Sequence, residues 1–255
     1  MAGMTPRRTI LGPALAGFAL ALGSHPEVAR RLAVTLGAEP RRALPLDRLL
    51  ELGLNHLALA GIGLALVALM GIGLGILATR DFAAPLRAGI DGAAAAAQAV
   101  PPVVMVALAL PVLGFGGPPT VLALVAYSIM PMLRGTVGAI EAVSPEARQA
   151  AIAIGLSPRQ VLLQVELPLA AGIILDTFRT ALVLAVATTA VGGLAGASTL
   201  GTPIVAGLQN QNLVPMLQGA AATAALALLC DAALLAAASR LRRWNIPAGR
   251  GATCP

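Results

Sequence analysis

The sequence of 255 residues contains no lysine, few charged side chains and very few aromatic ones. All 17 basic residues are arginine, and only 11% of residues are charged. A P-loop requires the lysine of G-x-x-x-x-G-K-[ST], so this chain does not hydrolyse ATP by that route. About a quarter of the residues in a soluble domain are charged. This chain has too few charged residues to cover the surface of a folded protein in water. A P-loop ATPase and a soluble protein are both excluded.

Potential metal ligands are equally scarce. The two cysteines, Cys230 and Cys254, and the two histidines, His25 and His56, lie far apart and show no metal-ligand spacing. We therefore expect no metal site, no catalytic residue and no cofactor bound by this chain. The net charge is +6, but aromatic residues amount to only 2% and the arginines lie at the ends of apolar runs. Such arginines indicate membrane topology, and we expect no nucleic-acid partner.

Long apolar runs dominate the composition. Hydrophobic residues make up 58%, and positions 52–79, 92–133 and 180–230 contain no charged side chain. Each run exceeds the roughly 20 residues that a spanning helix needs. We therefore predict an all-α polytopic membrane bundle, embedded in lipid, with about six spans. The predicted spans are 9–24, 52–79, 88–113, 120–136, 169–194 and 213–239.

The charges divide the chain into four regions. We predict an N-terminal span over 1–24, an external loop over 25–50, a transmembrane domain over 51–240 and a cytoplasmic tail over 241–255. The first region also fits a signal peptide, because two arginines precede a short apolar stretch. Most arginines fall on one side of the membrane if both termini are cytoplasmic, as the positive-inside rule requires. This orientation predicts a multi-pass protein of a bacterial inner membrane.

Proline and glycine mark two features of the spans. Pro101-Pro102 interrupts the third span, and such a break persists at membrane depth only beside protein or a water-filled cavity. Gly71 and Gly75 form a GxxxG pair that permits close helix packing. We expect the third span to face a transport pathway. Candidate pathway residues, each of which fits plain helix packing equally well, are Gln98, Pro101, Met105, Tyr127, Met130, Thr188 and Thr189.

A few charges fall within or close to the predicted spans, where they are costly and often functional. Asp176 and Arg179 are three residues apart on one helix and can neutralise each other. Asp91 and Asp231 lie near predicted span ends and fit interfacial positions. An intramembrane enzyme using the three aspartates is an alternative hypothesis, although they belong to separate spans.

The segment 144–168 carries an unusual density of helix-capping residues. Ser144 fits an N-cap and is followed by proline at the first helical position. Gly155 suits the left-handed residue that ends a helix. Ser157 and Gln160 form a capping box that opens a second helix. We predict a hairpin of two short helices, with Pro168 as the boundary at which the fifth span starts.

The first helix of this hairpin has an apolar face. Ala147, Ala150, Ala151 and Ile154 recur at i, i+3, i+4 and i+7. The hairpin could lie on the membrane headgroups, or its apolar face could enter a groove on a cytoplasmic partner.

The same segment resembles the EAA loop of ABC importer permeases. The matching residues are Gln149, Ala150, Ala151, Gly155, Val165, Glu166, Leu167 and Pro168. The resemblance implies a coupling helix that inserts into a cytoplasmic ATPase subunit, which uses ATP and is present in two copies. It also implies a second permease subunit and a periplasmic substrate-binding protein. Gln149 departs from the usual Glu and Val165 from a frequent Ile, which puts charge pairing with the ATPase in doubt.

Other segments resemble the osmoprotectant branch of these permeases, above all the low-affinity glycine-betaine type. They are Gln98–Pro102, Pro111–Gly116, Val165–Ala170, Arg179-Thr180 and Gly196–Pro203, and the resemblance covers residues 50–240. It implies translocation of glycine betaine or choline by alternating access, driven through the hairpin. An amino acid or a sulfonate is an alternative solute. Quaternary ammonium groups are held in aromatic cages, which this chain lacks, so we expect recognition in the binding protein.

Overall fold

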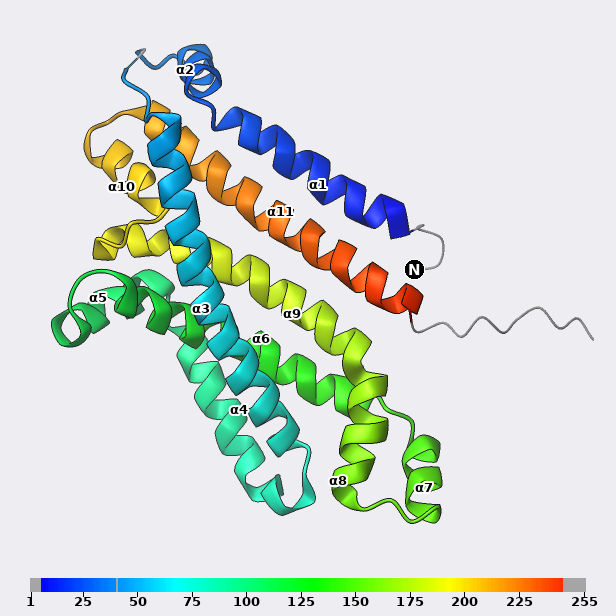
Figure 1. Cartoon of the computed structure of the whole chain (residues 1–255). Coiled ribbons are helices and arrows are strands. Elements are labelled where there is room, and N and C mark those ends of the chain that lie inside the picture. The colour runs from blue at the N-terminus through cyan, green and yellow to red at the C-terminus, as the bar shows by residue number, and fades with distance from the viewer. Residues whose placement is uncertain (1–5, 40, 245–255) are drawn as a thin grey trace, which may run out of the picture.

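The computed structural model describes residues 6–39 and 41–244, and within these ranges it contains helices and no strand. Figure 1 shows a bundle of long helices with a small helical hairpin at one end and short helices at the other. We call these the hairpin end and the opposite end. The all-α fold that the sequence predicts is confirmed. Residues 1–5 and 245–255, which belong to the predicted first span and tail, lie outside the described residues.

The long helices are apolar enough to cross a bilayer. Four described segments pass by length and composition: Leu46–Ala78, Gly117–Glu141, Pro158–Ala195 and Leu213–Ser239. A bent pair of helices adds a fifth, and Ile10–Gly23 forms a shorter apolar helix. Each of the six predicted segments thus coincides with an apolar helix or helix pair, but only four of them, or five with the bent pair, are long enough to count as spans. The long elements are α1 (Pro6–Gly23), α3 (Leu46–Ala78), α6 (Gly117–Glu141), α9 (Leu167–Thr189) and α11 (Leu213–Trp244).

The bent pair is α4 (Ala84–Ala99) and α5 (Pro102–Leu113), which meet at an angle of 93°. Val100 and Pro101 each precede a proline, and both adopt extended backbone with ψ of 122° and 140°. The residue before a proline avoids the helical region, so two such residues in succession turn the chain sharply. The predicted break is confirmed, but the two helices do not continue in one direction as an interrupted span would.

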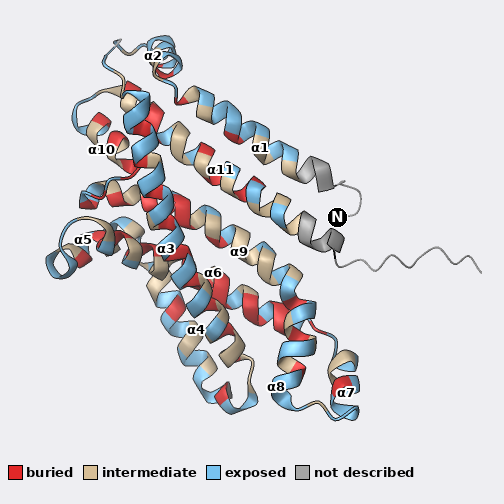
Figure 2. Cartoon of the chain, viewed as in Figure 1, coloured by how far each residue is buried: buried red, intermediate tan, exposed pale blue. Residues whose placement is uncertain are grey.

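Glycines allow α3 and α6 to pack closely. A Cβ atom at Gly71 would lie 2.7 Å from Met132, and one at Gly75 would lie 2.7 Å from Thr136. Real Cβ atoms do not approach so closely, so the two backbones are near enough only because these residues lack side chains. The predicted close contact at the GxxxG pair is confirmed. Figure 2 shows many of the buried residues along α6, which packs against α3 and α9.

Two buried polar side chains fasten the opposite end. Nε2 of His56 lies 2.9 Å from the carbonyl oxygen of Val186, and the Leu200 N–H donates to Nδ1 at 3.2 Å. Gln218 accepts from the Leu44 N–H at 2.8 Å and donates to the Leu44 carbonyl at 3.0 Å. These side chains provide hydrogen-bond partners for backbone groups near helix ends. Buried backbone N–H and C=O groups need such partners. His56 is therefore a structural residue.

The predicted external loop over 25–50 is more ordered than a loop. It contains α2 (Pro26–Thr35), and α3 begins within it at Leu46. The small residues Ala29 and Ala33 of α2 pack against Val214 in the first turn of α11. At the same end lie a 3₁₀ segment (Ala190–Ala195) and α10 (Gly201–Gln209). Helix α1 packs along α11, so the first turn of α1 lies toward the end of α11 (Figure 1).

Candidate functional site

The hairpin between α6 and α9 begins with α7 (Pro145–Ala153), which has both predicted caps. The Ser144 hydroxyl accepts the N–H of Ala147 at 3.3 Å. At the other end Gly155 has φ of +87°, in the left-handed region. The N–H groups of Gly155 and Leu156 return to the last turn at 2.9 and 3.1 Å, the pattern of a Schellman cap. Local sequence thus determines where this helix starts and stops.

The second half of the hairpin begins as predicted and ends differently. The Ser157 N–H donates to Oε1 of Gln160 at 2.8 Å, as expected of the capping box. From there α8 (Pro158–Val161), a π-helical turn (Leu162–Glu166) and α9 follow without a break. Pro168 therefore does not separate the hairpin from the span. The π-turn shifts the helical hydrogen bonds by one residue just before Pro168. The helix therefore continues through Pro168, although proline has no N–H to donate.

The predicted apolar face of α7 is divided in two. Ala151 is buried and Ala147 packs on the cluster of Ile140 and Ala170 at the ends of α6 and α9. Ile154, by contrast, is 78% exposed, and Ile152, which lies outside the predicted stripe, is 62% exposed. Ala147 and Ala151 therefore hold α7 against the bundle. The two isoleucines are two positions apart, ~200° around the helix, so Ile154 at the end of α7 and Ile152 are separate exposed apolar side chains.

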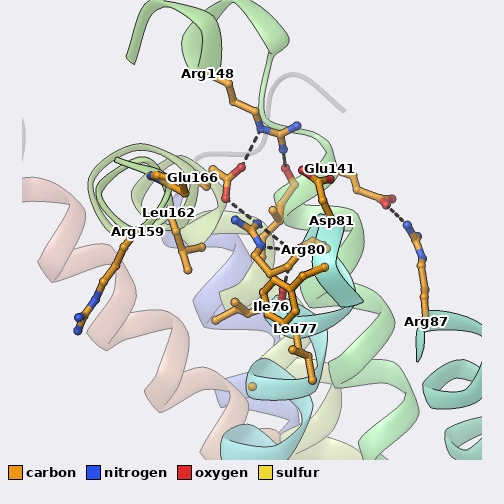
Figure 3. Close-up of a pocket in the computed structure, with 15 residues that line it drawn as sticks. Ile76, Leu77, Arg80, Asp81, Arg87, Glu141, Arg148, Arg159, Leu162 and Glu166 are labelled. Carbon is orange, nitrogen blue, oxygen red and sulfur yellow. Dashed lines mark hydrogen bonds and ion pairs between the residues drawn. The ribbon is translucent and has the colours of Figure 1, made fainter. Parts of the chain in front are cut away.

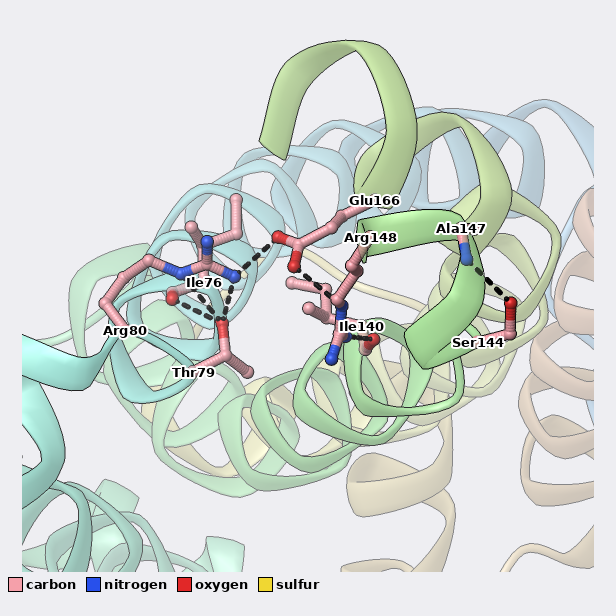
Figure 4. Close-up of polar contacts among 8 residues, drawn as sticks. All are labelled: Ile76, Thr79, Arg80, Ile140, Ser144, Ala147, Arg148 and Glu166. Atoms are coloured by element: carbon pink, nitrogen blue, oxygen red, sulfur yellow. Dashed lines mark hydrogen bonds and ion pairs between the residues drawn. The ribbon is translucent and has the colours of Figure 1, made fainter. Parts of the chain in front are cut away.

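Glu166 lies in the π-turn and is only 5% exposed, yet it meets two arginines. Its Oε2 accepts a hydrogen bond from Nη2 of Arg80 at 2.7 Å. Its Oε1 lies 3.0 Å from Nε of Arg148, an ion pair without hydrogen-bond alignment. Arg148 also donates to the Ile140 carbonyl, and Arg80 donates to Thr79 (Figure 4). The carboxylate therefore joins α3, α7 and α9.

These contacts explain how a carboxylate can be buried here. A buried charge is tolerated when it is paired and hydrogen-bonded, and two guanidinium groups outweigh its charge. Nearby, Arg87 and Glu141 form a second pair at 2.8 Å that is about half exposed. A cavity of about 960 Å³ lies between the ends of α3, α6 and α8 (Figure 3). Four arginines and three acids line it: Arg80, Arg87, Arg148 and Arg159, with Asp81, Glu141 and Glu166. The hairpin end thus carries charges of both signs and is held to the spans by ion pairs.

The other residues of the predicted coupling loop take distinct positions. Gln149, Ala150 and Pro168 are exposed, while Val165 is half-buried. Leu167 packs on the same cluster as Ala147. The structure thus gathers these residues in one hairpin, and their coupling role stays a prediction.

The candidate pathway residues lie on several helices and differ in burial. Pro101 is exposed at the α4–α5 turn, and Gln98, Met105 and Tyr127 are half-buried. Met130, Thr188 and Thr189 are buried. Met130 packs between α3, α4 and α6, and the Thr189 hydroxyl donates to a carbonyl of its own helix at 2.8 Å. Their role in a pathway remains a prediction.

The charges of α9 and α11 meet in a way that sequence did not predict. Arg179 donates two hydrogen bonds to Asp231, at 2.8 and 3.0 Å. The expected partner Asp176 lies 3.7 Å away and its side chain is 68% exposed. Asp231, predicted near a span end, is only 9% exposed. The bond joins residues 52 apart in sequence, which no local pattern reveals. Within the described residues no group of His, Cys, Asp or Glu has metal-binding geometry.

Apolar spans, a Pro-broken helix pair and a capped hairpin held to the span ends define a class: a multi-pass membrane protein with an ordered helical hairpin at one end of its spans. The sequence pattern of the family described as binding-protein-dependent transport system inner membrane component matches residues 71–243. The chain belongs to this family. It is therefore a multi-pass inner-membrane transport subunit, not an enzyme.

The chain is also similar to individual permeases in sequence and to a solved transporter in fold. The chain is 38% identical over 135 residues to the glycine betaine/carnitine/choline permease OpuCD of Bacillus subtilis (strain 168), covering 52% of this chain and 59% of that protein. It is 36% identical over 135 residues to the osmoprotectant permease OsmY of Salmonella typhimurium (strain LT2), covering 53% and 57%. The chain thus spans less than two thirds of these relatives' length. The inward-facing MetNI methionine ABC transporter shares the fold, with a TM-score of 0.64, 19% identity, and coverage of 78% and 96%.

Proposed function

We propose that the chain is the permease subunit of an ABC importer for a small quaternary-ammonium osmoprotectant such as glycine betaine or choline. The observation that carries the proposal is the hairpin, which combines fixed caps, an exposed apolar surface and an ionic attachment to the spans. The relatives named for glycine betaine, carnitine and choline support the solute class. An amphipathic helical surface of this kind fits a groove on a partner protein.

In this account the hairpin end faces the cytoplasm, together with both termini. Ile154 enters a groove on an ATPase subunit, and Glu166 transmits the movement of α7 to α3 and α9. Two ATPase subunits and a second permease, identical or different, complete the transporter, and a periplasmic binding protein delivers the solute. ATP is hydrolysed by the ATPase subunits, and the permease domain comprises 51–240, after an N-terminal span over 1–24 and an external segment over 25–50.

Transport by a reconstituted complex tests this proposal. Proteoliposomes would contain the chain with its ATPase partner, and the binding protein would be added with radiolabelled glycine betaine, choline, an amino acid or a sulfonate. We expect uptake of the quaternary ammonium solutes only, requiring both ATP and the binding protein. Uptake restricted to the amino acid or the sulfonate would contradict the solute class. ATP-independent uptake would contradict the importer mechanism itself.

A further inference from the structure

Helix α2 lies at the level where a span ends. Its buried residues Ala29 and Ala33 pack against Val214, in the first turn of α11, and the candidate span Leu213–Ser239 starts one residue earlier. Figure 1 views α2 almost along its axis, whereas α1 and α11 run across the picture, so α2 lies crosswise to both. A helix that runs crosswise at the boundary of the spans lies along the membrane surface.

The apolar surface of α2 is wider than its contact with the bundle. Helical residues follow one another by ~100°, which places Val28, Leu32 and Leu36 along one side, next to the buried alanines. These three residues are 39%, 45% and 66% exposed. The opposite side carries Glu27 and Arg31, which are exposed, Arg30, and one exposed apolar residue, Val34. Polar residues on one side and unpartnered apolar residues on the other are typical of a helix in a membrane interface.

An apolar groove opens near the start of α2, although no residue of α2 lines it. It has a volume of about 540 Å³ and lies between the end of α1, the first turns of α3, and α11. Ala21 and Ser24 line it where α1 leads into α2, and Leu46 and Leu50 line it from α3. Leu50 is 61% exposed, like other leucines on the outward faces of α1 and α3. A groove of this composition, open at span depth, fits an acyl chain.

We propose that α2 and this groove form a lipid-binding surface, with Val28, Leu32 and Leu36 seated among the acyl chains of the leaflet at the opposite end. The level of α2, its crosswise direction and the adjoining groove all favour lipid over a protein partner. The arginines of α2 then face the headgroups and water. The proposal does not depend on which solute is transported.

Tryptophan quenching tests the proposal with matched positions. The chain contains one native tryptophan, so the variants are built on Trp244→Phe. Leu32→Trp and Val34→Trp are compared in the full transporter, reconstituted with lipid brominated near the glycerol. Leu32 and Val34 are 45% and 49% exposed but point in directions ~200° apart on the helix. Leu36→Trp is a second probe of the lipid side.

We expect bromolipid to remove most of the emission of Leu32→Trp and Leu36→Trp, with a shift of both spectra to shorter wavelength. Val34→Trp keeps its emission and is quenched by iodide in the buffer. Equal bromolipid quenching at residues 32 and 34 overturns the proposal, as does its absence at both 32 and 36. If Leu32→Trp responds to added binding protein but not to bromolipid, a protein covers this surface and the lipid assignment is wrong.

Discussion

At the scale of single residues, the ion pairs of this protein differ in burial, and therefore in the cost of removing one partner. Glu166 is buried between two arginines of different helices, whereas the Arg87–Glu141 pair at the same end is about half exposed. An exposed pair contributes little because water replaces the lost partner. A buried charge that loses its partner finds no such replacement.

Glu166→Gln is therefore expected to destabilise the protein much more than Glu141→Gln. The first substitution leaves Arg80 and Arg148 facing a neutral amide, at a cost of about 2 kcal/mol. The second removes less than ~1 kcal/mol. Thermal unfolding in detergent, followed by tryptophan fluorescence or aggregation, measures both. Equal melting temperatures for the two variants would show that Glu166 does not hold α3, α7 and α9 together.

The charges of α9 and α11 allow a similar comparison. Arg179→Gln leaves Asp231 buried without its two hydrogen bonds, which we expect to cost about 3 kcal/mol. Asp176→Asn removes an exposed carboxylate 3.7 Å from the guanidinium and should cost less than ~1 kcal/mol. Chemical denaturation in mixed micelles ranks the variants. A larger loss for Asp176→Asn would mean that the two aspartates exchange roles in the membrane.

At the scale of elements, close packing of α3 on α6 depends on which face each glycine occupies. Gly75 faces Thr136, whereas Gly73 of the same helix has no atom within 4 Å of its Cβ position. The same substitution at these two positions therefore has opposite effects.

Gly75→Ala should destabilise the protein by about 1–3 kcal/mol, because the added methyl group forces α3 and α6 apart. Gly73→Ala should be neutral or stabilising by up to ~1 kcal/mol, because alanine favours the helix over glycine. Melting temperatures of the two variants, purified in the same detergent, provide the comparison. An unchanged Gly75→Ala protein would contradict the close approach of the two helices.

In the hairpin, the helix caps were predictable from sequence and the long-range contacts were not. Caps depend on residues within one turn, so Ser144, Gly155 and the Ser157–Gln160 box were predictable and are found. The continuous helix past Pro168 was not, because a π-turn leaves no clear local signature. The contact of Glu166 with Arg80 joins residues 86 apart, which only the packed spans bring together.

In the spans, too, local features were predictable from sequence and the packing of distant segments was not. Long apolar runs predicted where the chain crosses the membrane, and Pro101-Pro102 predicted the break between α4 and α5. The 93° turn follows from two successive residues in extended backbone, which a pattern of apolar residues does not reveal. Helix α2 was missed because its charges obscured the small residues Ala29 and Ala33, which pack on α11.

At the scale of the whole molecule, the protein has two fastened ends joined by long spans. Glu166 fixes the hairpin to the ends of α3 and α9, and His56 fixes α3 to α9 and the α10 region at the opposite end. Because α8, the π-turn and α9 follow one another without a break, one continuous helix connects the hairpin with the opposite end. In the proposed transporter this helix carries the movement that ATP hydrolysis produces in the partner.

The most direct test measures glycine betaine uptake and ATP hydrolysis together in proteoliposomes of the assembled transporter, comparing Ile154→Asp with Ile154→Met. Ile154 is 78% exposed, so neither variant should lose stability, and Met preserves the apolar surface. We predict that Ile154→Met transports like the unmodified protein, while Ile154→Asp loses uptake and binding-protein-stimulated hydrolysis with an unchanged melting temperature. Uptake per ATP that stays unchanged in Ile154→Asp would contradict coupling through the hairpin.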